Sequence, residues 1–275
     1  MKIKKILNNN AVLVGENGND FIWIGVGLGF QMKPGLEADE TKIQKIFVLK
    51  EKSLYQRFEK LISSIPIEYF SLTNSIVQLA KKRLNYDFSE MLYISLTDHL
   101  FNLVKLYRQG IVLHNNLFWE IKKIYPEEFD IGKQALQLIN KKINVSLEEE
   151  EACNIAMHLI NARINEGNTP PVDSRMMAKK VHDIIAIIRL SNKLTISEDT
   201  IAYDRFVTHL RFFFQRLKNF TEDQTEPNSL LTYAKEQYQQ AFKTMKLVEE
   251  YLGTTLNDDE QLYLTLHIQK LINNN

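Results

Sequence analysis

The chain has 275 residues, of which 44% are hydrophobic and 25% are charged, and its formal net charge at pH 7 is zero. This length and composition predict two or three globular domains, and the zero net charge excludes a bulk electrostatic argument for binding nucleic acid or membranes. A single cysteine, Cys153, excludes an intrachain disulfide framework and a multi-thiolate metal site. No apolar run approaches the roughly 20 residues that span a bilayer, so we expect a cytoplasmic protein without membrane insertion.

The first 50 residues predict a small antiparallel sheet. Runs of β-branched and aromatic residues with a period of two occur at KIKKILN, AVLVG, DFIWIG and KIQKIFVL. Between the second and third runs, Asn17-Gly18 favours a tight hairpin turn. A four-stranded sheet of this size leaves a face or an edge uncovered, which predicts pairing with a second copy of the chain.

From about residue 55 onward the hydrophobic pattern becomes helical, in stretches such as FEKLISSIPIEYFSLTNSIVQLAKKRL and FDIGKQALQLINKKI. The segment NEGNTPPVD, residues 165–173, combines glycine with paired prolines and predicts a linker. We therefore expect a multidomain protein. A small, dimerising, antiparallel β-sheet domain at residues 1–55 precedes two all-α helical bundles at residues 56–169 and 170–275.

Four of the six histidines occupy equivalent places in the two helical halves. SLTDHL, which ends one residue after His99, resembles RFVTHL around His209, and EACNIAMHLI around His158 resembles EQLYLTLHIQ around His267. The two histidines are 59 positions apart in the first half and 58 in the second. The acidic segments VSLEEEE and TTLNDDE precede the second histidine of each pair at the same distance and align Glu151 with Glu260. The halves are therefore predicted to be homologous domains.

The residues themselves leave several uses of these imidazoles open. A duplicated module could keep histidines for the same core hydrogen bonds, although a buried imidazole is costly to desolvate. Metal chemistry lacks the expected HExxH or carboxylate-histidine spacing. The His182-Asp183 dipeptide resembles that of metal-dependent phosphohydrolases without their other motifs. A nucleophile elbow for serine or cysteine chemistry is also missing.

Reversible phosphorylation is the remaining use of the four histidines. Neutral imidazole is nucleophilic near physiological pH, and a phosphoryl group adds close to two negative charges. His99, His158, His209 and His267 are therefore candidate modification sites, while a purely structural use of the four imidazoles stays open. We expect no catalytic residues, metal ligands or cofactor.

A series of segments, in order and at matching spacing, resembles the BglG/LicT family of transcriptional antiterminators over essentially the full chain. They are MKIKKILNNNAV at the start, GLGFQ at 27–31, IPIEYF at 65–70, ISLTDHL at 94–100, EEFDIGKQAL at 127–136, VSLEEEEA before MHLINA, YDRFVTHLRFFFQRL at 203–217 and LYLTLHI at 262–268. The resemblance implies a co-antiterminator RNA-binding domain followed by two phosphotransferase-system regulation domains (PRDs). Such proteins bind, as homodimers, an RNA hairpin in a nascent leader transcript and prevent the terminator stem from forming.

The same resemblance implies how the four histidines are used, since they fall on the family's phosphorylation positions. A sugar-specific permease of the phosphotransferase system would phosphorylate the first PRD and inhibit the protein, whereas the carrier HPr would phosphorylate the second PRD and activate it. β-Glucoside utilisation is the implied setting. We expect Asp98, Arg205 and Arg211 to support the phosphorylated histidines through charge or hydrogen bonds.

By matching the family pattern, the expected RNA-contacting residues are Lys5, Asn10, Gly25, Phe30 and Gln31. Lysine can meet phosphate, asparagine can bond base edges, and phenylalanine can stack on an unpaired base. The sequence departs from the family at Val26, where a basic residue is usual between two glycines. Seven lysines against five acidic residues in the first 50 positions make only a weak basic bias.

Two other classes of protein compete with this interpretation. A PRD-containing DNA-binding activator would need an N-terminal helix-turn-helix, which the early strand pattern opposes. A metal-dependent hydrolase would need the histidines as ligands. The sequence therefore favours an RNA-binding antiterminator that is not an enzyme.

Overall fold

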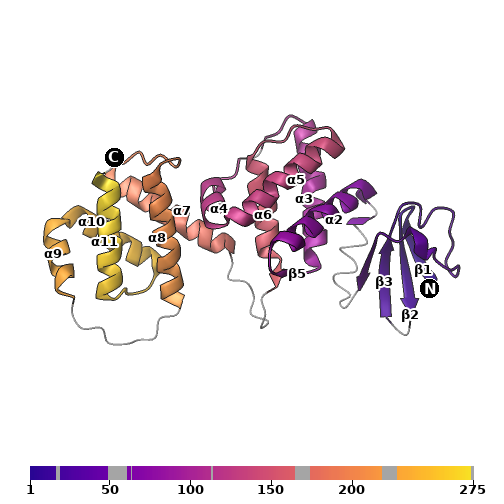
Figure 1. Cartoon of the computed structure of the whole chain (residues 1–275), viewed down its shortest axis with the longest axis horizontal. Helices are drawn as coiled ribbons and strands as arrows, with labels where there is room; N and C mark the ends of the chain where they lie inside the picture. The colour runs from indigo at the N-terminus through magenta and orange to yellow at the C-terminus, as the bar shows by residue number, and fades with distance from the viewer. Residues whose placement is uncertain are drawn as a thin grey trace. The chain divides into compact units, whose positions relative to one another are not determined.

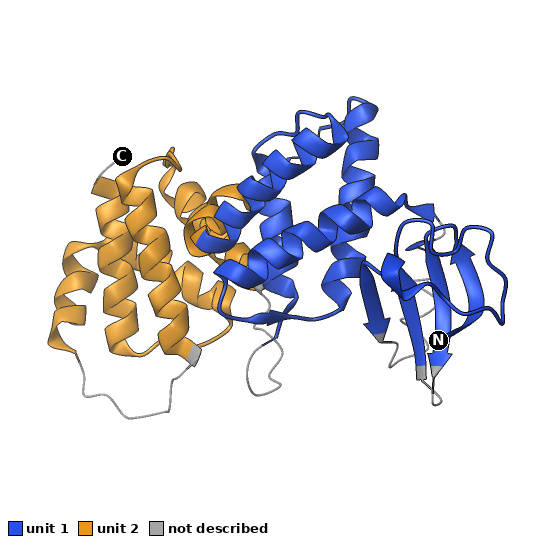
Figure 2. Ribbon diagram, turned by 45° about the vertical axis from the view of Figure 1, so that its right-hand side comes forward, with its two compact units in different colours: residues 1–114, 127–171 blue, residues 115–126, 172–275 orange. Residues whose placement is uncertain are grey.

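The computed structural model describes residues 1–16, 19–48, 61, 62, 64–112, 114–164, 174–218 and 228–273. The chain divides into two compact units, residues 1–114 with 127–171 (unit 1) and residues 115–126 with 172–275 (unit 2) (Figure 2). The predicted Asn17-Gly18 turn, the linker at 165–173 and the predicted domain boundaries near residues 55 and 169 lie outside the described residues.

The N-terminal part of unit 1 is the expected antiparallel sheet, with strand order β1-β2-β3-β4 (Figure 1). The strands are β1 (Lys2–Asn8), β2 (Ala11–Glu16), β3 (Asn19–Ile24) and β4 (Lys45–Val48), and a 3-10 turn η1 (Glu40–Lys42) precedes the last strand. Alternate residues of neighbouring strands, including Val12 and its partner Trp23, point to one face and pack with Ile3 and Leu28. The period-two sequence pattern is confirmed as four strands with a buried face.

The rest of unit 1 is helical apart from a short ribbon. Its helices are α2 (Ile67–Arg83), α3 (Met91–Arg108), α5 (Pro126–Ile143) and α6 (Glu150–Asn161), and the ribbon pairs β5 (Asp87–Phe88) with β6 (Arg163–Ile164). A buried hydrogen bond from the Thr97 hydroxyl to the Thr73 hydroxyl, 2.9 Å long, joins α3 to α2. The two-residue strands add a small ribbon to a bundle that was expected to be all-α.

Unit 2 repeats this helix order. Its helices are α7 (Ser174–Asn192), α8 (Ile201–Lys218), α9 (Ser229–Gln237), α10 (Gln239–Leu252) and α11 (Asp258–Asn273). The side chain of Asn192 donates to the Thr244 hydroxyl at 3.0 Å and so joins α7 to α10. Gly253 caps the C-terminal end of α10, and its φ of +65° is the left-handed conformation that glycine adopts without strain. The prediction of a β-sheet domain followed by two helical repeats is confirmed.

One short helix of the first repeat is part of unit 2. Helix α4 (Phe118–Ile124) lies on α7 and α8, and in Figure 2 its segment has the colour of unit 2. Its buried Glu120 accepts hydrogen bonds from the Tyr203 hydroxyl (3.0 Å) and from Nδ1 of His182 (3.1 Å). Lys123 forms an ion pair with Asp204 of α8 at 2.6 Å. The corresponding helix of the second repeat, α9, packs on its own α10 and α11.

Among the described residues, the helices are all too short or too polar to cross a lipid bilayer.

Candidate functional site

The first histidine pair lies between α3 and α6 of unit 1. The ring centres of His99 and His158 are 4.8 Å apart. Nε2 of His99 is buried, lies 3.8 Å from a carboxylate oxygen of the buried Glu151, and forms no hydrogen bond with the residues that the structure describes. On the facing ring, Nδ1 of His158 is 3.3 Å from the Ser95 hydroxyl. The two imidazoles therefore share a largely buried space with an acid.

Burial keeps this first pair uncharged. It lowers the pKa of His99 to about 4, helped by the neighbouring His158, and it also lowers the pKa of His158 against the opposing charge of Asp98. Burial raises the pKa of Glu151, which disfavours its charged form as well. At neutral pH both imidazoles carry no charge and keep a lone pair on one ring nitrogen.

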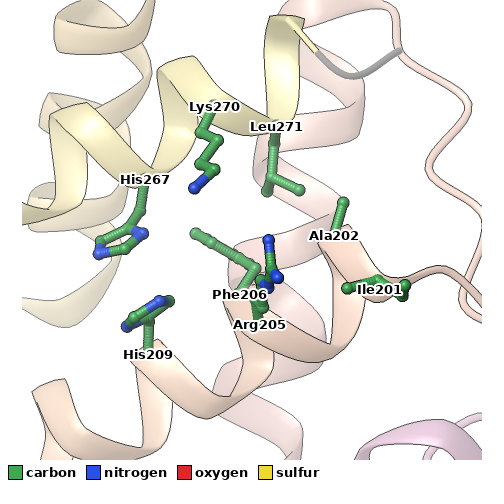
Figure 3. A pocket seen from close by; sticks show the side chains of 8 residues that line it. All are labelled: Ile201, Ala202, Arg205, Phe206, His209, His267, Lys270 and Leu271. Carbon is green, nitrogen blue, oxygen red and sulfur yellow. The ribbon is translucent and has the colours of Figure 1, made fainter.

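The second pair lies between α8 and α11 of unit 2 and is more tightly stacked. The ring centres of His209 and His267 are 3.7 Å apart, and Nδ1 of His209 is 2.9 Å from the Tyr263 hydroxyl. Figure 3 shows the two rings facing each other at the side of a hollow. The hollow has a volume of about 310 Å³ and is also lined by Lys270 of α11 and Arg205 of α8. The pair is therefore accessible from a hollow that carries positive charge.

The second pair is also neutral, but for an additional reason. Burial lowers the pKa of His209, and the positive charges of Lys270, Arg216 and Arg205 lower it further. For His267, burial comes first, followed by His209, Lys270 and Arg216, and its pKa is about 4. Because these cations disfavour a protonated imidazole, they would favour a negative group attached to it.

An arginine makes the main difference between the two repeats. Arg216 donates two hydrogen bonds to Glu260, from Nε at 2.5 Å and from Nη2 at 2.9 Å. In the first repeat the equivalent acid is Glu151, and the position seven residues after His99 holds Leu106 in place of arginine. Thus the second repeat places cations around its histidine pair, whereas the first repeat places the buried acid Glu151 beside His99.

Of the three residues expected to support the phosphorylated histidines, Asp98 and Arg205 act on a histidine pair, whereas Arg211 does not. Asp98 accepts a hydrogen bond from Asn102 (3.1 Å) and acts on His158 through charge. Arg205 lines the hollow beside the second pair, whereas Arg211 is exposed on α8 and is not among the cations that shift the pKa values of this pair.

Sequence reasoning missed several neighbours of the histidines: Ser95, Glu151, Arg216, Glu260, Tyr263 and Lys270. Helical spacing was the available signal. Tyr263 precedes His267 by four residues and Lys270 follows it by three, and both offsets place side chains on the same face of a helix.

Two of the five predicted RNA-contacting residues, Asn10 and Gly25, are joined at one end of the sheet. The backbone N–H of Gly25 donates to the carbonyl of Asn10 (2.8 Å), and the Asn10 side-chain oxygen accepts from the N–H of Gly27 (2.8 Å). A Cβ at Gly25 would collide with the carbonyl oxygen of Lys42, so only glycine fits there. Asn10 therefore builds the loop that begins at Gly25.

The other three residues of the predicted set are exposed. Phe30, 57% exposed, follows this loop, and Gln31 beside it has a φ of +56°. Lys5 lies on β1 opposite Leu13 of β2. An exposed aromatic ring beside a rigid loop is the kind of surface on which an unpaired base stacks.

In the described part of the chain, no three His, Cys, Asp or Glu side chains form a group that could hold a metal ion.

Comparison with known proteins agrees with this architecture. The model of the CAT RNA binding domain matches residues 1–56, and the model of the PRD domain matches twice, at residues 74–162 and 182–271. Transcription antiterminator LicT of Bacillus subtilis (strain 168) is 38% identical over 277 residues, with 99% of each chain covered. The Beta-glucoside operon antiterminator of Dickeya chrysanthemi is 37% identical, covering 98% of this chain and 96% of that one.

A solved structure shares the fold of the first part of the chain. The crystal structure of GlcT CAT-PRDI matches with a TM-score of 0.52 and 31% identity, over 60% of this chain and 98% of that one. Together these matches define the class, a CAT RNA-binding domain joined to two PRDs. The chain belongs to the BglG/LicT family of transcription antiterminators. Its relatives regulate transcription.

Proposed function

We propose that this protein is a homodimeric, cytoplasmic antiterminator that binds a hairpin in a nascent leader transcript and prevents the terminator from forming. The sheet domain supplies the RNA-binding surface, through Lys5, Asn10, Gly25, Phe30 and Gln31. β-Glucoside utilisation is the setting suggested by the Dickeya relative. The protein performs no catalysis of its own beyond accepting phosphoryl groups.

The main support for regulation by histidine phosphorylation is the pair of facing, neutral imidazoles in each PRD. Histidine rings 4.8 Å and 3.7 Å apart occur at equivalent places in both repeats, and burial lowers the pKa of all four. A neutral imidazole is the form that attacks a phosphoryl donor. We therefore assign phosphorylation by the sugar phosphotransferase system to His99, His158, His209 and His267.

The different charges around the two pairs support opposite responses. In the first PRD, close to two additional negative charges would lie beside Glu151, so repulsion and desolvation would open the packing of α3 on α6. In the second PRD the same charge would meet Lys270, Arg205 and Arg216 and would tighten α8 against α11. This fits inhibition of the first domain by a sugar permease and activation of the second by HPr.

Mapping of phosphohistidines tests this assignment. The full-length protein is incubated with phosphoenolpyruvate, enzyme I and HPr, with and without the permease, and labelled residues are located by mass spectrometry under alkaline conditions. We expect label on all four paired histidines and none on His114 or His182, the two unpaired histidines, which serve as internal controls. Label confined to His114 or His182 would overturn the assignment.

RNA binding is tested separately by titration of a fluorescent leader hairpin. Protein phosphorylated through HPr alone should bind more tightly than unmodified protein, and protein phosphorylated in the first PRD should bind more weakly. A duplex DNA of the same leader sequence is the matched control. Tighter binding to that duplex than to the RNA hairpin would favour a DNA-binding activator.

A further inference from the structure

Tyr263 makes two contacts with one histidine of the second pair. Its hydroxyl oxygen is 2.9 Å from Nδ1 of His209 and 3.2 Å from the backbone carbonyl oxygen of the same residue. A carbonyl oxygen only accepts, and a tyrosine hydroxyl has one proton to donate. Both hydrogen bonds form together only if the hydroxyl donates to the carbonyl and Nδ1–H donates to the hydroxyl. The arrangement therefore selects the tautomer with the proton on Nδ1.

The tyrosine is itself held in place. The Arg216 guanidinium lies 4.3 Å from the centre of the Tyr263 ring, within the range of a cation–π interaction. The same guanidinium is bound to Glu260 through two hydrogen bonds. Glu260 precedes Tyr263 by three residues on α11, so both contact Arg216 from one face of that helix. A ring fixed in this way keeps its hydroxyl in reach of His209.

The other ring nitrogen of His209 is left available. With the proton on Nδ1, Nε2 keeps its lone pair, and it forms no hydrogen bond with the residues that the structure describes. Figure 3 shows the His209 ring beside the hollow that Lys270 and Arg205 line. An incoming phosphoryl group would thus find both a nucleophilic nitrogen and positive charge.

We propose that Tyr263 is a positioning residue that holds His209 in the Nδ1–H tautomer and so presents Nε2 as the atom that accepts the phosphoryl group. This inference deepens the proposed function and rests on it for the transfer step. The donor is a protein phosphohistidine whose second ring nitrogen is protonated.

The transfer balances as a displacement at phosphorus. The lone pair of Nε2 of His209 forms the new N–P bond, and the electrons of the broken N–P bond return to the donor nitrogen, which leaves as neutral histidine. The acceptor becomes a phosphorylated imidazolium that keeps its proton on Nδ1. The Tyr263 hydroxyl accepts a hydrogen bond from that proton before and after transfer, so the transfer requires no tautomer change.

In the first repeat a hydroxyl group contacts the other histidine of the pair, His158, which corresponds to His267 and not to His209. At the position of Tyr263 it has Asn154, whose amide donates to Glu151 at 2.8 Å. There the Ser95 hydroxyl lies 3.3 Å from Nδ1 of His158 and 3.4 Å from the carbonyl of Leu92, a longer version of the same arrangement. The contact of a tyrosine hydroxyl with both Nδ1 and the carbonyl oxygen of one histidine therefore occurs in the second repeat, at His209.

Nitrogen NMR tests the tautomer without any phosphorylation. The full-length protein is labelled with ¹⁵N-histidine, and long-range ¹H–¹⁵N spectra are recorded at pH 7.5 for wild type, Tyr263→Phe and Tyr251→Phe. The last variant is the matched control, because it removes the hydroxyl that donates to Asp183 at 2.6 Å elsewhere in unit 2. Wild type and the control should show a protonated Nδ1 and a bare Nε2 at His209, and Tyr263→Phe should lose this preference. A proton on Nε2 in the wild type would overturn the inference.

Phosphoryl transfer gives the second readout. With phosphorylated HPr as donor, ³¹P NMR should place the phosphoryl group of His209 on Nε2 in wild type. The rate of phosphoryl transfer to His209 should be about tenfold lower in Tyr263→Phe, because the imidazole loses the partner that orients it. In Tyr251→Phe the rate should be unchanged. A phosphoryl group on Nδ1, or equal rates in all three proteins, would contradict the proposal. If His209 is never labelled, the proposed function fails, whereas the NMR result still decides the tautomer.

Discussion

Glu120 and Tyr203 are 83 positions apart in the sequence and share a buried hydrogen bond of 3.0 Å. The bond joins α4, a helix of the first repeat, to α8, the helix that carries His209. His182 of α7 donates to the same carboxylate, so a single buried acid connects three helices of unit 2. A displacement of α8 relative to α7 would therefore strain the contacts that hold α4.

Replacing Glu120 by alanine should release α4 from unit 2. The change leaves the buried Tyr203 hydroxyl without its acceptor, which costs about 2 kcal/mol of unfolding free energy. The chain has two tryptophans, and one of them, Trp119, lies on α4. In a Trp23→Phe background, urea titration followed by tryptophan fluorescence should therefore show an earlier transition for Glu120→Ala. Glu236→Ala, an exposed acid on α9, is the control, and equal midpoints for the two variants would contradict this role of Glu120.

The stability of the protein should fall as the pH is lowered from about 6.5 to about 4. Burial depresses the pKa of His99 and of His267 from 6.5 to about 4 in the folded state, so the unfolded chain binds more protons in that interval. The contribution of these two neutral histidines to the free energy of unfolding is fully present above pH 6.5 and is lost as the pH falls toward 4. For the well-buried His99 it is on the order of 2–3 kcal/mol.

Thermal unfolding measured between pH 4 and pH 8 checks this dependence. The double variant His99→Gln/His267→Gln should have a flatter profile than wild type. Gln137→Ala, which removes an exposed side chain that carries no titratable group, should keep the wild-type slope. A double variant with the full wild-type slope would show that other groups cause the dependence.

Gly132 should not tolerate a side chain. A Cβ at this position of α5 would collide with the backbone carbonyl oxygen of Ala152 on α6, and backbone cannot move aside cheaply. Gly132→Ala should destabilise the protein by about 1–3 kcal/mol despite alanine's better helix propensity. Urea denaturation followed by far-UV circular dichroism measures the change. Gln137→Ala, exposed on the same helix, should be neutral or slightly stabilising.

Val26→Arg should strengthen binding to a leader hairpin. Val26 is 61% exposed in the loop between Gly25 and Gly27, beside the predicted RNA-contacting residues. An arginine there adds a phosphate contact, so affinity at low salt should rise several-fold. The slope of the logarithm of the binding constant against the logarithm of the salt concentration should become steeper by about one.

Fluorescence titration of the hairpin at several salt concentrations compares this variant with wild type. Val112→Arg is the matched control, because it adds the same charge at another exposed valine, outside the sheet. Equal affinities for Val26→Arg and wild type at all salt concentrations would refute the role of the loop charge.

The sequence by itself determined the order of the domains, the four strands and the duplicated histidines. Strand and helix periodicity are local properties, and a separation of 59 positions in one repeat against 58 in the other shows the duplication without any coordinates. The family resemblance, which also rests on a local pattern of residues, assigns Gly25 to the predicted RNA-contacting set. The need for glycine there depends on the approach of the Lys42 carbonyl, which no local pattern reveals.

Only the tertiary structure decided which charges surround each histidine pair and where α4 lies. Arg216 reaches Glu260 across 44 positions, and Glu120 reaches His182 across 62, because helix packing brings distant side chains within hydrogen-bond distance. Arg205 and Arg211 stand on one helix near His209, yet only Arg205 lines the hollow of the second pair. The direction of a side chain around a packed helix, and not its distance along the chain, makes that difference.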